Sequence, residues 1–212
     1  MLQCFPSAKA LGYDSKEMRL TSNSPLRQGT ILLIAAIAIV FGVEIATNSV
    51  GNDAALLKLG ALPDNGQLQG EFWRIATYSF LHFNWLHLLL NVGLLFWIGR
   101  IVERQIGTGQ GALVYFASVL CSAALILLVH NWHPKPGATV GASGGVFGLL
   151  GAALIIAYCQ NTDGRLRMWL WLVLLAGFAI SFLPDISMAG HIGGIIGGVP
   201  TALLLKIRNK TG

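Results

Sequence analysis

The stretch Gly141-Ala142-Ser143-Gly144-Gly145 places one hydroxyl among residues that have almost no side chain. It opens an apolar run that continues from Val146 to Cys159. At the start of a membrane helix, the glycines would let another backbone approach the hydroxyl closely, and the helix N-terminus would stabilise negative charge. Two interpretations of Ser143 remain open from this stretch alone: small-residue packing between membrane helices, or a nucleophile.

The composition around this stretch is that of a membrane protein. Hydrophobic residues make up 54% of the 212 residues and charged residues 11%, and the mean hydropathy is +0.65. An average soluble domain has about 25% charged residues. The net charge of +5 does not indicate a nucleic-acid partner, because the basic residues cluster at the ends of apolar runs and form no tract with aromatic residues.

Six apolar runs are long enough, with their flanks, to cross about 30 Å of hydrocarbon. They cover residues 30–46, 85–102, 111–129, 142–159, 168–183 and 188–205. We therefore expect an all-α polytopic membrane protein, with a bundle of six transmembrane helices in residues 29–207. Residues 1–28 are expected to form a short cytoplasmic tail, and residues 208–212 a cytoplasmic C-terminal end.

The distribution of Lys and Arg predicts the orientation of these helices. Eleven of the 14 Lys and Arg residues fall in the two termini and in the loops on the same side as the termini. Cytoplasmic loops carry the excess of positive charge in membrane proteins. Both termini are therefore predicted to be cytoplasmic, which makes the second, fourth and sixth helices start at the outer leaflet.

Each of these three helices carries polar side chains close to its outer end. They are His87 and Asn91 on the second helix, Ser143 on the fourth and His191 on the sixth. Ionisable residues inside a membrane are functional candidates by default. His82, His130 and His133 are interpreted instead as interfacial or loop residues.

His191 is followed by a stripe of glycines on its own helix face, at Gly194 and Gly198. Residues three and seven positions apart share a face, so another helix can pack there at short range. The glycine-rich face of the fourth helix is the expected partner: Gly144, Gly148 and Gly151. Such packing would bring the imidazole to Ser143, as its base. A histidine that only hydrogen-bonds between helices is the alternative.

His87 and Asn91 are spaced i, i+4 and share one helix face. Asn84 is expected to cap this helix. Two side-chain donors on one face could hold an oxyanion, or they could serve as polar contacts between helices. We expect no metal site, because His87 and His191 have no thiolate or carboxylate beside them, and no cofactor. Cys121 and Cys159 lie inside apolar runs and Cys4 in the polar tail, which argues against a disulfide framework.

Together these stretches resemble the rhomboid family of intramembrane serine proteases. The similarity runs over residues 73–198, in the order that the family shows. The matching stretches are Trp73-Arg74, His82, His87-Leu88-Leu89-Leu90-Asn91, Glu103-Arg104 with Gly107, Gly141-Ala142-Ser143-Gly144, and Ala189-Gly190-His191-Ile192-Gly193-Gly194 with Gly198.

The resemblance implies a serine endopeptidase with a Ser–His dyad, in which Ser143 attacks the peptide carbonyl and His191 transfers the proton. The Ser143 N–H, His87 and Asn91 would stabilise the oxyanion. An aromatic residue four positions after the serine stacks on the histidine in the family, and Phe147 occupies that position, where Tyr is frequent. Structural roles are implied for the remaining matches: Arg74, Glu103, Gly141, Gly144, Gly194 and Gly198.

The partners implied are transmembrane protein substrates and membrane lipid, in a bacterial inner membrane. The sequence leaves the oligomeric state open. Two other functions are weaker alternatives: a catalytically silent rhomboid-like protein that binds membrane helices, and a six-helix transporter. The presence of both Ser143 and His191 disfavours the first. The second is disfavoured because no inverted repeat is visible.

Overall fold

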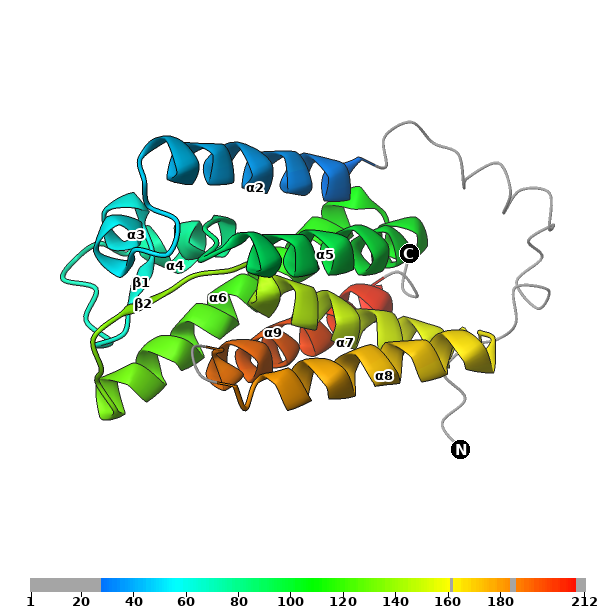
Figure 1. Cartoon of the computed structure of the whole chain (residues 1–212). Coiled ribbons are helices and arrows are strands. Elements are labelled where there is room, and N and C mark those ends of the chain that lie inside the picture. The colour runs from blue at the N-terminus through cyan, green and yellow to red at the C-terminus, as the bar shows by residue number, and fades with distance from the viewer. Residues whose placement is uncertain (1–27, 161, 184–185, 209–212) are drawn as a thin grey trace.

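The computed structural model describes residues 28–160, 162–183 and 186–208 (Figure 1). The described part of the chain contains six long helices, one for each predicted apolar run: α2 (Gly29–Ala46), α5 (Trp85–Ile106), α6 (Thr108–Trp132), α7 (Ser143–Cys159), α8 (Gly164–Ile180) and α9 (Met188–Arg208). The predicted all-α membrane fold is confirmed. The predicted tail (1–28) and C-terminal end (208–212) lie outside the described residues, except for Gln28 and Arg208.

Within the described residues, four helices are long and apolar enough to cross a membrane: α2, α5, α6 and the Met188–Leu205 part of α9. The other two, α7 and α8, have 17 residues each. At 1.5 Å per residue, 17 residues span about 26 Å, slightly less than the hydrocarbon core. Both helices are therefore slightly shorter than the hydrocarbon core of a bilayer is thick. Most of α7 is buried by the surrounding helices.

The sequence had suggested that the second apolar run ends at residue 102. The second helix instead continues through the charged residues that follow. Helix α5 continues to Ile106, and α6 begins at Thr108 after a single residue, Gly107, with φ of 88°. The helix continues because Glu103 is buried and bound. Its carboxylate accepts hydrogen bonds from the backbone N–H of Gly29 (2.7 Å) and the hydroxyls of Thr30 (2.8 Å) and Thr108 (2.6 Å).

Residues 47–84 fold into short elements rather than an irregular loop. These are α3 (Asp53–Leu59), β1 (Leu62–Pro63), α4 (Arg74–Thr77) and the 3₁₀ turn η3 (Tyr78–Phe80). Strand β1 pairs antiparallel with β2 (Ala138–Thr139), with Leu62 opposite Thr139. This pairing fixes the stretch that leads into Gly141 and α7 (Figure 1).

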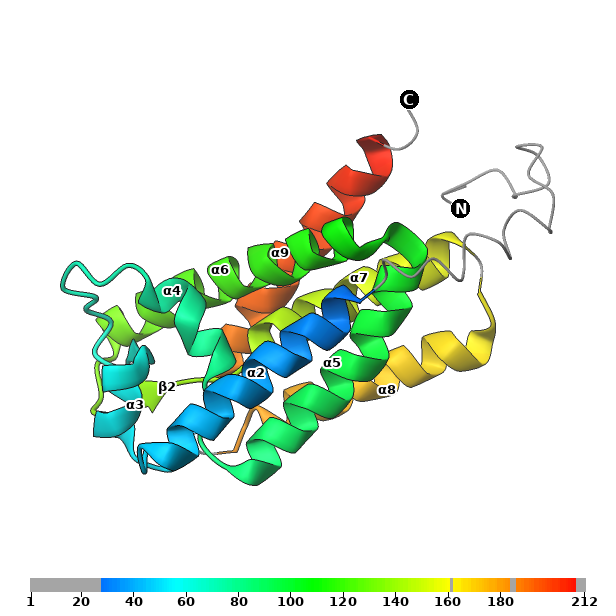
Figure 2. The same cartoon turned by 90° about the horizontal axis from the view of Figure 1, so that it is seen from above.

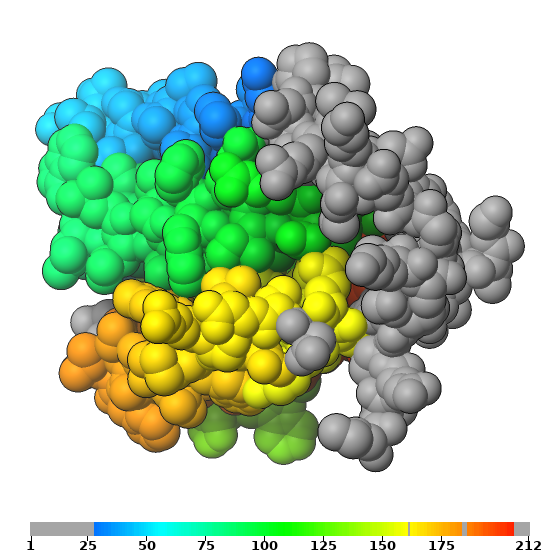
Figure 3. All heavy atoms as spheres, turned by 90° about the vertical axis from the view of Figure 1, so that its right-hand side faces the viewer, coloured from blue at the N-terminus to red at the C-terminus, as the bar shows by residue number. Residues whose placement is uncertain are grey.

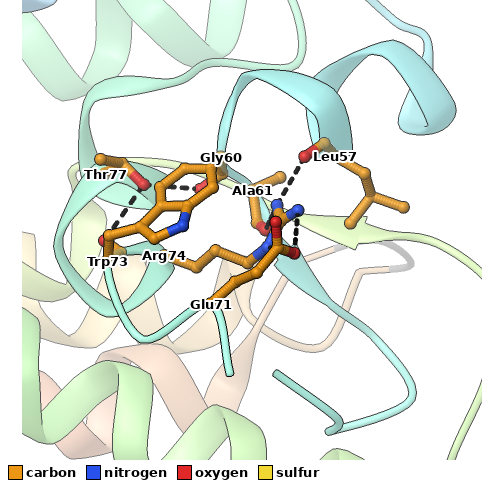
Figure 4. Close-up of polar contacts among 7 residues, drawn as sticks. All are labelled: Leu57, Gly60, Ala61, Glu71, Trp73, Arg74 and Thr77. Atoms are coloured by element: carbon orange, nitrogen blue, oxygen red, sulfur yellow. Dashed lines mark hydrogen bonds and ion pairs between the residues drawn. The ribbon is translucent and has the colours of Figure 1, made fainter. Parts of the chain in front are cut away.

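Arg74 holds this segment together (Figure 4). Its guanidinium donates to the carbonyls of Leu57 (2.5 Å) and Ala61 (2.9 Å) and forms a two-point contact with Glu71. The side chain is buried. Because its five donors form a rigid fork, an arginine can satisfy two carbonyls and a carboxylate at once.

The centre of the bundle is α7, packed against α9 and α6. Thirteen of the 17 described residues of α7 are buried, which explains why the helix is apolar on all sides. Helix α9 lies between α6 and α7 (Figure 2). A Cβ at Gly194 would collide with the carbonyl of Gly144, and one at Gly198 would collide with the carbonyl of Gly148. The two backbones therefore touch directly.

Helices α2 and α8 lie at the periphery. In the space-filling view of Figure 3, α2 (blue) lies on one side of α5 (green) and α8 (yellow) on the other. Of the described α8 residues, just Leu170 and Leu174 are buried. The end of α2 is fixed by the fully buried Glu44, whose carboxylate accepts from the backbone N–H of His82 at 3.0 Å. This backbone hydrogen bond satisfies a carboxylate that stands near the end of an apolar helix.

Candidate functional site

The starts of α5, α7 and α9 meet at one end of the bundle. Ser143 is the first residue of α7, and His87 and His191 lie in the first turns of α5 and α9. The backbone N–H groups of a first helical turn have no partner within the helix. Three helix N-termini therefore direct their backbone N–H groups and positive dipole ends toward this end of the molecule.

Ser143 is half-buried and follows a backbone bend at Gly141. Gly141 has φ of +129°, a left-handed conformation that favours glycine, and its N–H donates to the carbonyl of Tyr78 at 2.9 Å. A Cβ on Gly141 would lie 2.7 Å from Cε1 of His87. The bend thus brings the start of α7 against the imidazole of His87.

His191 is buried, with its ring parallel to the ring of Phe147. The ring centroids are 3.9 Å apart and the planes differ by 7°. Phe147 lies four residues after Ser143, on the same face of α7. Phe178 of α8 contacts Phe147 edge-on at 5.6 Å. The imidazole is therefore held on the face of α7 that carries the hydroxyl.

The ring of His191 also has a hydrogen-bonding partner just after the end of α8. Its Nδ1 lies 2.5 Å from Oγ of Ser181, the residue that directly follows α8. Ser181 is buried, and its hydroxyl donates to the carbonyl of Gly177 at 2.8 Å. One imidazole nitrogen is thus occupied, and Nε2 is left for other contacts.

His87 and Asn91 occupy one face of α5, as their spacing predicted. The carboxamide of Asn84 caps the helix by accepting from the N–H of His87 at 2.8 Å. Nδ2 of Asn91 donates to the carbonyl of His87 at 2.9 Å. An amide nitrogen carries two N–H groups, so one donor of the buried Asn91 remains.

His82 lies in the link between η3 and α5, as the sequence had suggested for a loop residue, whereas His130 lies in the last turn of α6. His82 is fully buried, with its ring edge-on to that of His87 at 5.1 Å. Desolvation, assisted by repulsion from His87, lowers the pKa of His82 to about 3, so this ring is neutral at pH 7. His130 is buried in α6, with Nδ1 3.3 Å from Asp64. His133 is exposed, as expected.

Sequence reasoning missed Ser181. It carries no motif, and it was taken as part of an apolar run over residues 168–183. A signal was present: Ser181 is a polar residue near the outer end of a helix, like His87, Ser143 and His191. What could not be read from the sequence is that α8 ends at Ile180, which turns Ser181 toward α9.

The described residues contain no group of three or more His, Cys, Asp or Glu side chains that could hold a metal ion. The described cysteines, Cys121 and Cys159, are both unpaired. The polar groups around Ser143 are therefore hydroxyl, imidazole and amide, which suit nucleophilic acyl transfer more than metal binding.

Comparison with known proteins places this arrangement in a family. The Rhomboid domain family matches residues 69–208. Rhomboid protease GluP of Bacillus subtilis (strain 168) is 32% identical over 202 residues, 91% of this chain and 38% of the relative. Rhomboid protease GlpG of Enterobacter sp. (strain 638) is 30% identical over 190 residues, 86% of this chain and 65% of the relative.

A relative named as inactive is also similar. Inactive RHOMBOID-like protein 8 of Arabidopsis thaliana is 34% identical over 131 residues, 59% of this chain and 36% of the relative. The chain spans less than two thirds of the length of each of these three relatives. The family match covers most of the chain and includes all the side chains that meet at the starts of α5, α7 and α9. This chain is an integral membrane protein that belongs to the rhomboid family.

Proposed function

We propose that this protein is an intramembrane serine endopeptidase that hydrolyses peptide bonds in or near the transmembrane segments of other membrane proteins. The observation that carries the proposal is the parallel stacking of His191 on Phe147, one helical turn after Ser143. This contact keeps a base and a hydroxyl on one face of α7. The proposal assigns the chemistry to the helical part of the chain, residues 29–207.

In this mechanism Ser143 Oγ attacks the scissile carbonyl carbon while His191 removes the hydroxyl proton. His191 then donates the proton to the leaving amine, and an acyl-enzyme remains. Water, activated by His191, hydrolyses the ester and restores the serine. Each step uses one imidazole nitrogen, and no carboxylate partner is required.

The tetrahedral intermediate carries a negative charge on the former carbonyl oxygen. We assign its stabilisation to the backbone N–H of Ser143, the ring of His87 and the free N–H of Asn91. Removing one such donor from an oxyanion hole costs about 10²–10³ in kcat in a well-studied serine protease. The dipole of α7 adds to the stabilisation because Ser143 is its first residue.

The substrate class follows from the environment of the site. A transmembrane helix hides its carbonyls in internal hydrogen bonds, so the segment must unwind before Ser143 can attack. Substrates with small or helix-weakening residues near the cleaved bond are therefore favoured. We propose that the substrate enters sideways from lipid, between α5 and the loosely packed α8.

The positive-inside distribution of Lys and Arg supports cytoplasmic termini and a site near the opposite face of the membrane. We propose a bacterial inner membrane as the location. Water reaches the starts of α5, α7 and α9 from the periplasmic side, which the hydrolysis step requires.

The test is cleavage of a single-pass membrane substrate by purified protein in liposomes. Ser143→Ala and His191→Ala are each expected to abolish cleavage, whereas His133→Ala, at an exposed histidine, leaves it unchanged. A fluorophosphonate probe should label the wild type and spare Ser143→Ala. Retained cleavage in either site variant would defeat the dyad assignment.

A silent membrane-helix binder is the alternative function, and the similarity to a relative named inactive supports considering it. Such a protein would bind a transmembrane segment without cutting it. Absence of fluorophosphonate labelling in folded wild-type protein, together with equal substrate capture by wild type and Ser143→Ala, would establish this alternative.

A further inference from the structure

We propose that Ser181 is a positioning residue that fixes the tautomer and orientation of His191. This inference deepens the proposed protease function and rests on it. A base that serves Ser143 must present an unprotonated nitrogen to the hydroxyl. Which nitrogen of a neutral imidazole carries the proton is set by the hydrogen bond that the other nitrogen makes.

The direction of the bond between Ser181 and His191 follows from the other partner of Ser181. A serine hydroxyl has one proton to donate and two lone pairs that accept. The proton of Ser181 is committed to the carbonyl of Gly177, at 2.8 Å. Oγ of Ser181 is therefore the acceptor for Nδ1–H of His191, 2.5 Å away. This leaves Nε2 without a proton.

The geometry around the ring makes this contact effective. Phe147 fixes the plane of the imidazole from α7, and the Ser181 hydroxyl fixes its rotation within that plane. Ser181 and His191 are both buried, so water does not replace the bond. The same acceptor also stabilises the imidazolium that forms during attack, because the charged ring is the stronger donor.

No carboxylate of the described residues forms a salt bridge with His191. The titratable side chain that interacts with it from α5 is His87, whereas α7 contributes the stacked ring of Phe147, and the link after α8 contributes Ser181. A neutral hydroxyl thus performs the orienting part of the role that a carboxylate has in a Ser–His–Asp triad. It supplies no negative charge, so its contribution is expected to be smaller.

The experiment compares two variants of equal size, Ser181→Thr and Ser181→Val. Thr retains the hydroxyl and is expected to keep kcat within about threefold of the wild type. Val removes it and is expected to lower kcat about tenfold with KM unchanged, as loss of one hydrogen bond to the reacting group predicts. Equal kcat for Thr and Val would overturn the proposal.

A matched control separates this role from loss of a helical hydroxyl. Thr201 of α9 is half-buried and also donates to the carbonyl four residues earlier, Gly197, at 2.7 Å. It has the same type of backbone bond as Ser181 without an imidazole partner. Thr201→Val is expected to leave kcat unchanged, and a tenfold loss in this control would contradict the assignment.

The second measurement does not depend on activity. Nitrogen-15 NMR of histidine-labelled protein should show His191 protonated at Nδ1 in Ser143→Ala, with the signal assigned by comparison with His191→Asn. In Ser143→Ala/Ser181→Ala the Nδ1–H form should lose its dominance. A dominant Nε2–H form in Ser143→Ala refutes the proposal even if the protein is a protease. Cleavage that survives Ser143→Ala refutes the proposed function instead.

Discussion

Phe147 departs from the family pattern in residue type. It occupies the position where Tyr is frequent, and it still stacks on His191. Its ring end points at α8: a Cβ on Gly177 would collide with Cζ of Phe147. A phenolic hydroxyl at that ring position would project toward the Gly177 backbone. Because Phe147 has no hydroxyl, the backbone of α8 can lie close to the end of its ring.

Phe147→Tyr is therefore expected to destabilise the protein. Overpacking a filled core costs about 1–3 kcal/mol, and Phe147 is 5% exposed. The midpoint of thermal unfolding in detergent should fall, and cleavage should fall with it because His191 loses its stacking geometry. Phe116→Tyr, at a more exposed ring on α6, is the control. An unchanged midpoint for Phe147→Tyr would show that the ring has room at Cζ.

At the scale of elements, the contact between α7 and α9 determines whether the site forms. Ser143 and His191 lie on different helices, so their approach depends on how closely those helices pack. The Gly194–Gly144 and Gly198–Gly148 contacts leave no room for a side chain. Small residues are used in this way where membrane helices approach closely.

Gly194→Ala is expected to separate α7 from α9 and to abolish most cleavage. The added methyl group would overlap the carbonyl of Gly144, and the cost in unfolding free energy should be at least about 1–3 kcal/mol. Gly93→Ala is the matched control, since a Cβ there would have no neighbour within 4 Å. The control should gain up to about 1 kcal/mol from helix propensity. Similar behaviour of the two variants would contradict a contact-specific effect.

Arg74 is the anchor of the segment between α2 and α5. Arg74→Lys is expected to lower the unfolding free energy by about 2 kcal/mol, because a lysine cannot replace the fork that binds Leu57, Ala61 and Glu71. Lys58→Ala, at an exposed basic residue of α3, should have little effect. Chemical denaturation in mild detergent, followed by tryptophan fluorescence, measures both. Full stability of Arg74→Lys would show that charge alone suffices.

At the scale of the whole molecule, α8 is the helix best placed to move. It has two buried residues among those described, whereas α7 has thirteen. Trp169 of α8 contacts Trp97 of α5 edge-on, with centroids 5.7 Å apart. Trp169 lies near the start of α8 and Trp97 in the second half of α5. This contact therefore lies near the start of α8 and just past the midpoint of α5, away from His87 and Ser181.

Trp169→Ala is expected to loosen α8 and to speed cleavage of a transmembrane substrate by a few-fold. An aromatic pair of this kind contributes about 0.5–1.5 kcal/mol, which limits the effect to about tenfold. Cleavage of a short soluble peptide, which does not need sideways entry, should stay the same. Trp132→Ala, at an exposed tryptophan of α6, is the control. Equal acceleration with both substrates would argue against entry between α5 and α8.

The sequence alone determined the class of the protein and the six apolar segments, because hydropathy is a local property that length and composition reveal. It also identified Ser143, His191, His87 and Asn91 as candidates, since polar side chains stand out in apolar runs. Their roles remain predictions until the variants are tested. The extension of α5 past residue 102 was missed, because a buried acceptor such as Glu103 is indistinguishable in sequence from a charged residue in a loop.

The tertiary structure alone decided which groups touch. Two contacts join residues whose spacing in the sequence gives no sign of them: the hydrogen bond between Ser181 and His191, and the pairing of Asp64 with His130. The burial of His82 is likewise not visible in the sequence. The physical reason is that such contacts depend on where helices end and on which faces pack. Those features are set by side-chain volume across the whole bundle, and no single segment of the chain encodes them.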